Sequence, residues 1–164
     1  MHPPSGPAWL VWLETSGLAV AMRQWTWLYP IVEIAHILGF VILVGSAFMF
    51  DARLLGWSRA IPVSALERHL LTWARGSLLL IVPTGAMMFV AHATEMAENP
   101  AFRLKLILIA AAFLNAAVFH RWPFRRVGDW DTEVAGPGGA RSAGILSLAL
   151  WTGVIACGRL IAYF

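Results

Sequence analysis

Charged residues are scarce in this sequence: 13% of its 164 residues are Asp, Glu, Lys or Arg, whereas 59% are hydrophobic. The mean hydropathy is +0.70, which lies outside the range of ordinary soluble domains. This composition excludes a soluble globular protein and indicates an integral membrane protein. The net charge of +3 comes from arginines in the loops, so the basic balance requires no nucleic-acid partner.

Cysteine is nearly absent as well. Cys157 stands alone in the last apolar segment, which excludes an intrachain disulfide and a cysteine-based metal cluster. The N-terminal stretch "MHPPSGP" lacks the Lys or Arg that opens a signal peptide, so we expect it to remain in the mature protein.

Long apolar runs are what the sequence has in abundance. A membrane-spanning helix needs about 20 mostly apolar residues. Four segments meet this requirement: 28–50, 70–93, 102–120 and 143–163. The short loops between them predict an all-α, up-and-down four-helix bundle that forms one domain over residues 1–164. Residues 8–22 place tryptophans near one helix face, which predicts a short helix lying in the outer membrane interface.

The arginines predict the orientation. Arg53, Arg59 and Arg68 lie between the first two segments, and four more arginines lie between the last two. The positive-inside rule therefore puts both loops in the cytoplasm and both termini outside. Arg75 is expected at the inner interface or paired with Asp51, the residue that marks the exit of the first segment.

Two loop regions carry local signals. Pro62 in the first turn, with Ser64 and Glu67 at capping-box spacing, predicts that the second helix starts near residue 62. It would run to about residue 97, with a kink at Pro83. The stretch "DWDTEVAGPGGARSAG" is rich in glycine and acidic residues, which predicts a flexible linker before the last helix.

His36 is the clearest functional candidate. An ionisable side chain is costly inside a bilayer, and His36 lies roughly 10 Å below the outer interface, counting about 1.5 Å per residue from Tyr29. Glu33 lies one turn above it on the same face and Gly39 one turn below, where a missing side chain would leave a slot for a flat ring. A haem ligand is one interpretation; a neutral histidine bonded to a neighbouring helix is the other.

Haem b takes one or two axial ligands from facing helices. His92 and Lys105 share the outer leaflet with His36, so either one is the candidate second ligand. His69 and His120 lie on the inner side and would hold a second haem if they faced each other. Arg159, Arg103 and Arg23 on the outer side could pair with haem propionates, because guanidinium groups match carboxylates. Each is equally explained as an anchor at the membrane interface.

Other metal centres fit less well. The "EIAH" stretch has the E-x-x-H spacing of di-iron bundles, but those proteins use two such motifs and two further glutamates. Zinc or copper would need several converging His, Cys or Met ligands, which the apolar segments lack.

The segments "EIAHILGFVILVGSAFMFDARLLG", "TG" at Thr84 and Gly85, and "NPAFRLKLILIAAAFLNAAVFH" resemble a family of small uncharacterised bacterial membrane proteins. More distantly, they resemble the CopD-type copper-resistance membrane domain and the HemJ-type protoporphyrinogen oxidase. The HemJ resemblance implies haem b at His36 and Lys105. The chain departs from that pattern by lacking a proline-arginine pair after the first helix and a histidine just before Lys105.

These observations lead to one expected function and two alternatives. We expect a haem b protein of the bacterial inner membrane that passes electrons from a quinol-type donor to an outer-face partner. Glu33 would hydrogen-bond the His36 ring and take up a proton. The alternatives are a HemJ-like porphyrinogen oxidase, hence an oxidoreductase, and a cofactor-free accessory subunit or CopD-like metal-handling protein. The protein could also form oligomers.

Overall fold

The computed structural model describes residues 6–134 and 136–163, and these residues form helices and loops without a strand. The helices are α1 (Ala8–Glu14), α2 (Gly17–Gln24), α3 (Leu28–Leu54), α4 (Val63–Ala91), α5 (Ala93–Glu98), α6 (Pro100–Arg121), η1 (Pro123–Asp129), α7 (Gly138–Leu160) and η2 (Ile161–Tyr163). Helices α3, α4 and α6, and α7 together with η2, are long and apolar enough to cross a membrane. The predicted all-α, multi-pass architecture is confirmed.

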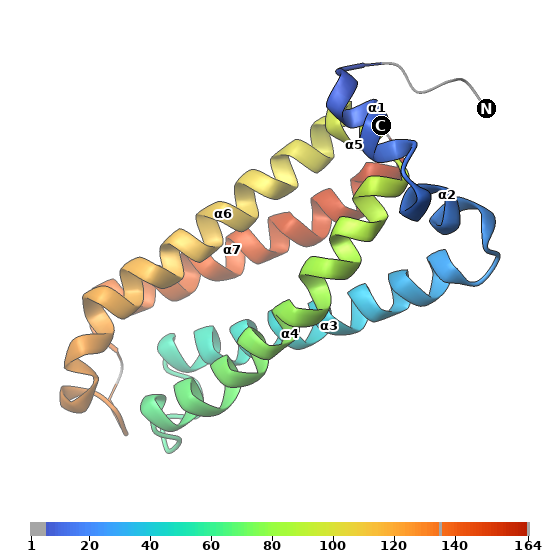
Figure 1. Ribbon diagram of the computed structural model, residues 1–164. Helices are drawn as coiled ribbons and strands as arrows, with labels where there is room; N and C mark the ends of the chain where they lie inside the picture. Colours follow the sequence, from blue (N-terminus) through green and yellow to red (C-terminus); the bar gives the residue numbers. More distant parts are fainter. Residues whose placement is uncertain (1–5, 135, 164) are drawn as a thin grey trace.

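The four long helices form two antiparallel pairs, as Figure 1 shows. Helix α3 packs along α4, α6 packs along α7, and a contact between α3 and α7 joins the pairs. Helices α4 and α6 have at most marginal contact with each other. We call the end with the α3–α4 and α6–α7 connections the inner end, and the end with α1, α2 and α5 the outer end. Large apolar side chains cover the outside of the long helices, for example Leu79 and Leu114, as expected where lipid replaces water.

The start of α4 differs from the predicted capping box. Helix α4 begins at Val63, close to the predicted position, and Ser64 does not cap it. The Asp131 carboxylate accepts hydrogen bonds from the Ser64 backbone N–H and hydroxyl, both at 2.8 Å. Glu67 pairs with Arg75 at 3.1 Å. The capping box predicted from Ser64 and Glu67 does not form, because the carboxylate of Asp131, 67 residues after Ser64, accepts the bond from the Ser64 N–H.

The prediction of a flexible linker is also wrong for the first residues of that stretch. Trp130 is buried, and the Asp131 carbonyl accepts hydrogen bonds from the Val63 N–H and the Arg53 guanidinium at 3.0 and 2.9 Å. Arg53 also donates to the Ile61 carbonyl at 2.7 Å. This stretch therefore ties α3, α4 and the α6–α7 connection together at the inner end.

The predicted interfacial helix consists of two helices, α1 and α2, with a break at Thr15 and Ser16. The Glu14 carboxylate accepts bonds from the Thr94 N–H and hydroxyl at 2.8 and 2.6 Å, and Arg23 donates to the Ala91 carbonyl at 2.6 Å. Burial alone would raise the pKa of Glu14, but the Thr94 hydrogen bonds and the Arg23 charge lower it below its ordinary value. These contacts hold α1 and α2 against the junction of α4 and α5.

Helix α4 continues through Pro83 and changes direction part-way along its length (Figure 1). It ends at Ala91 rather than at about residue 97, because His92 takes a non-helical backbone conformation. Residues 93–98 then form α5 as a separate helix.

Candidate functional site

His36 is held by α4 through one ring nitrogen. Its Nδ1 lies 3.1 Å from the Thr84 hydroxyl oxygen and 3.2 Å from the Ile81 carbonyl oxygen. The Thr84 hydroxyl donates its own proton to the Leu80 carbonyl, and a carbonyl can only accept. Nδ1 must therefore be the donor in both contacts, so that a neutral His36 carries its lone pair on Nε2.

Gly85 makes room for this ring. A Cβ at Gly85 would lie 3.0 Å from His36 Cε1, which is closer than such contacts normally come. The adjacent Thr84 and Gly85 thus act together, because Thr84 accepts a hydrogen bond and Gly85 lets the imidazole approach α4. The arrangement matches the alternative of a neutral histidine bonded to a neighbouring helix, and it leaves Nε2 without a hydrogen-bond partner among the described residues.

Gly39 and Glu33 do not play the parts predicted for them. The slot beside Gly39 is filled by Ile81, whose Cγ1 would lie 2.8 Å from a Cβ at this position. Gly39 therefore serves the close packing of α3 on α4. Glu33 is exposed. No hydrogen bond joins the His36 ring to the Glu33 carboxylate among the described residues, and Nδ1 donates to Ile81 and Thr84 instead.

The two candidate partners of His36 lie in different surroundings. Lys105 on α6 is near enough for its charge to act on the His36 ring, and its Nζ would lie 3.7 Å from a Cβ at Gly158. His92 packs edge-on against Tyr29, with the ring centroids 6.0 Å apart. Counting seven residues along α4 from Gly85, His92 lies about 10 Å from the level of His36.

The outer ends of α4 and α6 meet through two aromatic rings. Phe89 and Phe102 stack with centroids 5.6 Å apart. Phe102 precedes Lys105 by about one helical turn, and Phe89 follows Thr84 by a little more than one turn. The stacked rings therefore lie just outside the level of His36 and Lys105.

Of the remaining candidates, the two histidines lie at the inner end, and the outer arginines make contacts of their own. His69 is exposed, whereas His120 donates from Nδ1 to the Ala116 carbonyl at 2.8 Å and approaches Glu67 with Nε2 at 3.7 Å. Arg159 is exposed and bonds the Tyr163 hydroxyl at 2.9 Å. Arg103 donates to the Ala97 carbonyl at 2.6 Å.

Sequence reasoning missed Asp51 as a functional candidate. Its place at the end of the first apolar segment predicts an exposed residue, but only 5% of Asp51 is exposed. The signal available in the sequence was its position directly after the apolar run 28–50 and two residues before Arg53. Arg75, considered as its partner, pairs with Glu67 instead.

Comparison with models of known protein families, with curated proteins and with solved structures finds no match to this chain. Among residues 6–134 and 136–163, no three His, Cys, Asp or Glu side chains gather into a metal-binding group. A haem does not depend on such a group, because its iron takes only one or two ligands from the protein.

Proposed function

We propose that the protein is a membrane-bound haem b protein of electron transfer, with His36 Nε2 as an axial ligand of the iron. The observation that carries the proposal is the hydrogen bonding of His36. Histidines that bind metals generally donate their second ring N–H to a carbonyl or another acceptor, which fixes the tautomer and the ring orientation. Nδ1 of His36 has such acceptors in Ile81 and Thr84.

Lys105 is the second ligand in this proposal. Two side chains that would hold one haem iron must come from facing helices at about the same level of the bundle. His92, about two helical turns from the level of His36, is too distant for this arrangement. Lys105 lies near the level of His36, because Phe102, about one turn before it, stacks on Phe89, a little more than one turn beyond Thr84. Lys105 would lose a proton on binding the metal. The bound haem would supply one-electron chemistry, while the chain sets its position and surroundings.

The proposed setting follows from the distribution of arginine. The inner end faces the cytoplasm of a bacterial cell, and both termini face the periplasm. His36 and Lys105 then lie in the outer leaflet. We propose a quinol in the membrane as the electron donor and a periplasmic redox protein as the acceptor.

The test is the absorption spectrum of the purified protein from cells supplied with haem, oxidised and then reduced with dithionite. We expect a b-type spectrum that is lost in His36→Ala. In Lys105→Met the haem should stay bound with a shifted Soret band, because His36 remains. His92→Ala and the matched control His69→Ala should leave the spectrum unchanged.

Two results would contradict the proposal. An unaltered spectrum in His36→Ala would remove His36 as a ligand. Purified protein without any Soret band would favour the cofactor-free accessory function.

A further inference from the structure

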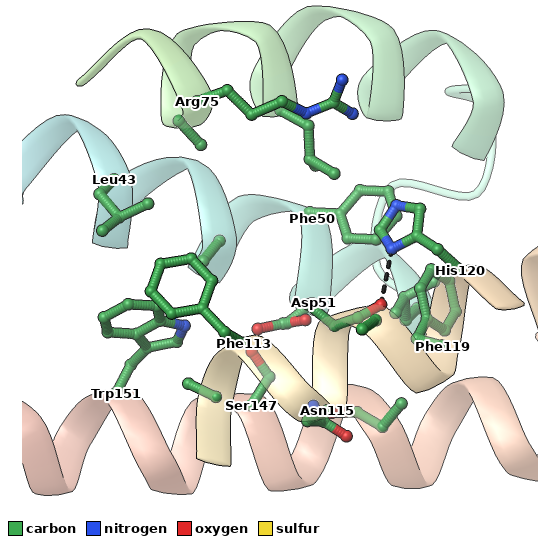
Figure 2. Close-up of a pocket in the computed structure, with 18 of the residues that line it drawn as sticks. Leu43, Phe50, Asp51, Arg75, Phe113, Asn115, Phe119, His120, Ser147 and Trp151 are labelled. Carbon is green, nitrogen blue, oxygen red and sulfur yellow. Dashed lines mark hydrogen bonds between the residues drawn. The ribbon is translucent and has the colours of Figure 1, made fainter. Parts of the chain in front are cut away.

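A cavity of about 340 Å³ lies between the four long helices in the inner half of the bundle. It belongs to a different part of the molecule from His36, which lies fifteen residues before Asp51 on α3, about 22 Å along the helix. Figure 2 shows its principal residues, with Asp51 and Ser147 between two groups of aromatic rings. The lining is otherwise mainly apolar, and its volume is within the range of small-molecule sites.

Asp51 is the unusual residue in this cavity. It is 95% buried, and its Oδ2 has no hydrogen-bond partner among the described residues. An unpaired carboxylate in an apolar environment is costly, so such groups normally have a partner. No ion pair joins Asp51 to a cation of the described residues: Arg75 is paired with Glu67, and the Arg53 guanidinium donates to backbone carbonyls. His120, which also lines the cavity, directs Nδ1 to the Ala116 carbonyl and Nε2 toward Glu67.

Aromatic rings stand on both sides of Asp51. Phe113 and Trp151 form one edge-on pair, with centroids 6.3 Å apart. Phe50 and Phe119 form another, with centroids 5.7 Å apart. The electron-rich faces of aromatic rings attract cations, most strongly where water is excluded. The cavity thus combines a negative group with walls that favour a positive one.

We propose that this cavity binds a small organic amine with an aromatic body, in its ammonium form, through Asp51. The ammonium group donates hydrogen bonds to the Asp51 carboxylate, and the aromatic body packs against the rings. Because α4 and α6 have at most marginal contact, such a ligand can enter from the lipid between these helices. This proposal is independent of haem binding at His36.

The experiment measures ligand binding to the full chain in lipid nanodiscs by isothermal titration calorimetry. The probe is 2-phenylethylammonium, and its neutral counterpart is 2-phenylethanol. We expect the ammonium to bind and the alcohol to bind at least tenfold more weakly. Asp51→Asn should weaken ammonium binding by about 30-fold or more, the loss expected when a buried charge pair loses one partner. The matched control Asp129→Asn changes an exposed aspartate outside the cavity and should bind as the unaltered protein does.

A second variant tests the cavity without touching the carboxylate. Ala116 lines the cavity but is exposed elsewhere, so Ala116→Leu should fill the space, keep the fold and abolish binding. Equal ammonium affinity in Asp51→Asn and unaltered protein would overturn the proposal, as would equal affinity for the alcohol. So would a lipid chain or a second copy of the protein that occupies the cavity and excludes the ammonium, as detected by native mass spectrometry.

Discussion

Asp51 and Arg53 lie two residues apart near the inner end of α3, and both are almost completely buried, at 5% and 1% exposure. Their surroundings differ. The Arg53 guanidinium donates through Nε and Nη2 to the carbonyls of Ile61, Arg59 and Asp131, although its Nη1 has no partner among the described residues. Asp51 Oδ2 also has no partner there, and no neighbouring charge among them offsets the burial of its carboxylate. Burial alone therefore does not reveal the role of a charged residue in this protein.

The difference separates a structural charge from a binding charge. Arg53 stabilises the fold because its hydrogen bonds join α3 to the carbonyls of Arg59 and Ile61 in the α3–α4 connection and of Asp131 in the α6–α7 connection. Asp51 costs free energy in the ligand-free protein, which is reasonable only if a ligand or proton offsets that cost.

The largest expected effect is that of Arg53→Met. The substitution keeps an apolar stem of similar length but removes the donors to three carbonyls. We expect the free energy of unfolding in detergent to fall by about 3 kcal/mol. The control Arg68→Met, at an exposed position on α4, should change it by less than about 0.5 kcal/mol. An equal loss in both variants would mean that Arg53 contributes no more than a surface charge.

The apolar runs of the sequence predict the four spans, because hydropathy is a property of each residue and the bilayer selects for it directly. The start of α4 lies before its apolar run and was predicted from Pro62 instead. The surroundings of Asp51 and Asp131 could not be predicted in this way. Both are acidic residues beside loops, and sequence alone treats them as solvated. Asp131 finds its partners 67 and 78 residues away, and the cavity around Asp51 exists only after α6 and α7 have packed against α3. Such long-range contacts leave no local pattern.

His36 illustrates the opposite case. Its depth in an apolar run identified it as a candidate before its surroundings were known, since intramembrane histidines are rare. The identity of its partner could not be predicted in the same way. Glu33 is close in sequence but exposed, whereas Thr84 comes from a helix that begins 27 residues after His36.

A smaller loss of stability is expected from substitution of Asp131, whose carbonyl binds Arg53 and whose carboxylate binds Ser64 at the inner end. Hydrogen bonds from the Ser64 backbone and side chain lower the pKa of Asp131 below its ordinary value of 3.8, despite partial burial. A lowered pKa in the folded state means that the carboxylate stabilises the fold fully above about pH 3.8 and loses this effect as the pH falls through the lowered value.

Asp131→Asn should therefore lower the free energy of unfolding by about 2 kcal/mol at neutral pH, the usual contribution of hydrogen bonds to a charged acceptor. It should also flatten the dependence of stability on pH below 4. Asp129→Asn, at an exposed neighbouring position, is the control and should retain the acid dependence. Thermal unfolding at a series of pH values measures both quantities. If stability depended on pH identically in the two variants, the loss of stability in acid would not come from protonation of Asp131 and loss of its bonds to Ser64.

The smallest change in the free energy of unfolding is expected for Asp51→Asn. Unlike the other two substitutions, it should not lower that free energy. The amide has nearly the same shape as the carboxylate but carries no charge, so the cost of an unpaired buried charge disappears. We expect the free energy of unfolding of the ligand-free protein to stay the same or to rise by up to about 1 kcal/mol. Arg53→Met, measured under the same conditions, gives the contrasting loss. A loss of 2 kcal/mol or more in Asp51→Asn would mean that the carboxylate stabilises the fold as Arg53 does, and the comparison between the two residues would fail.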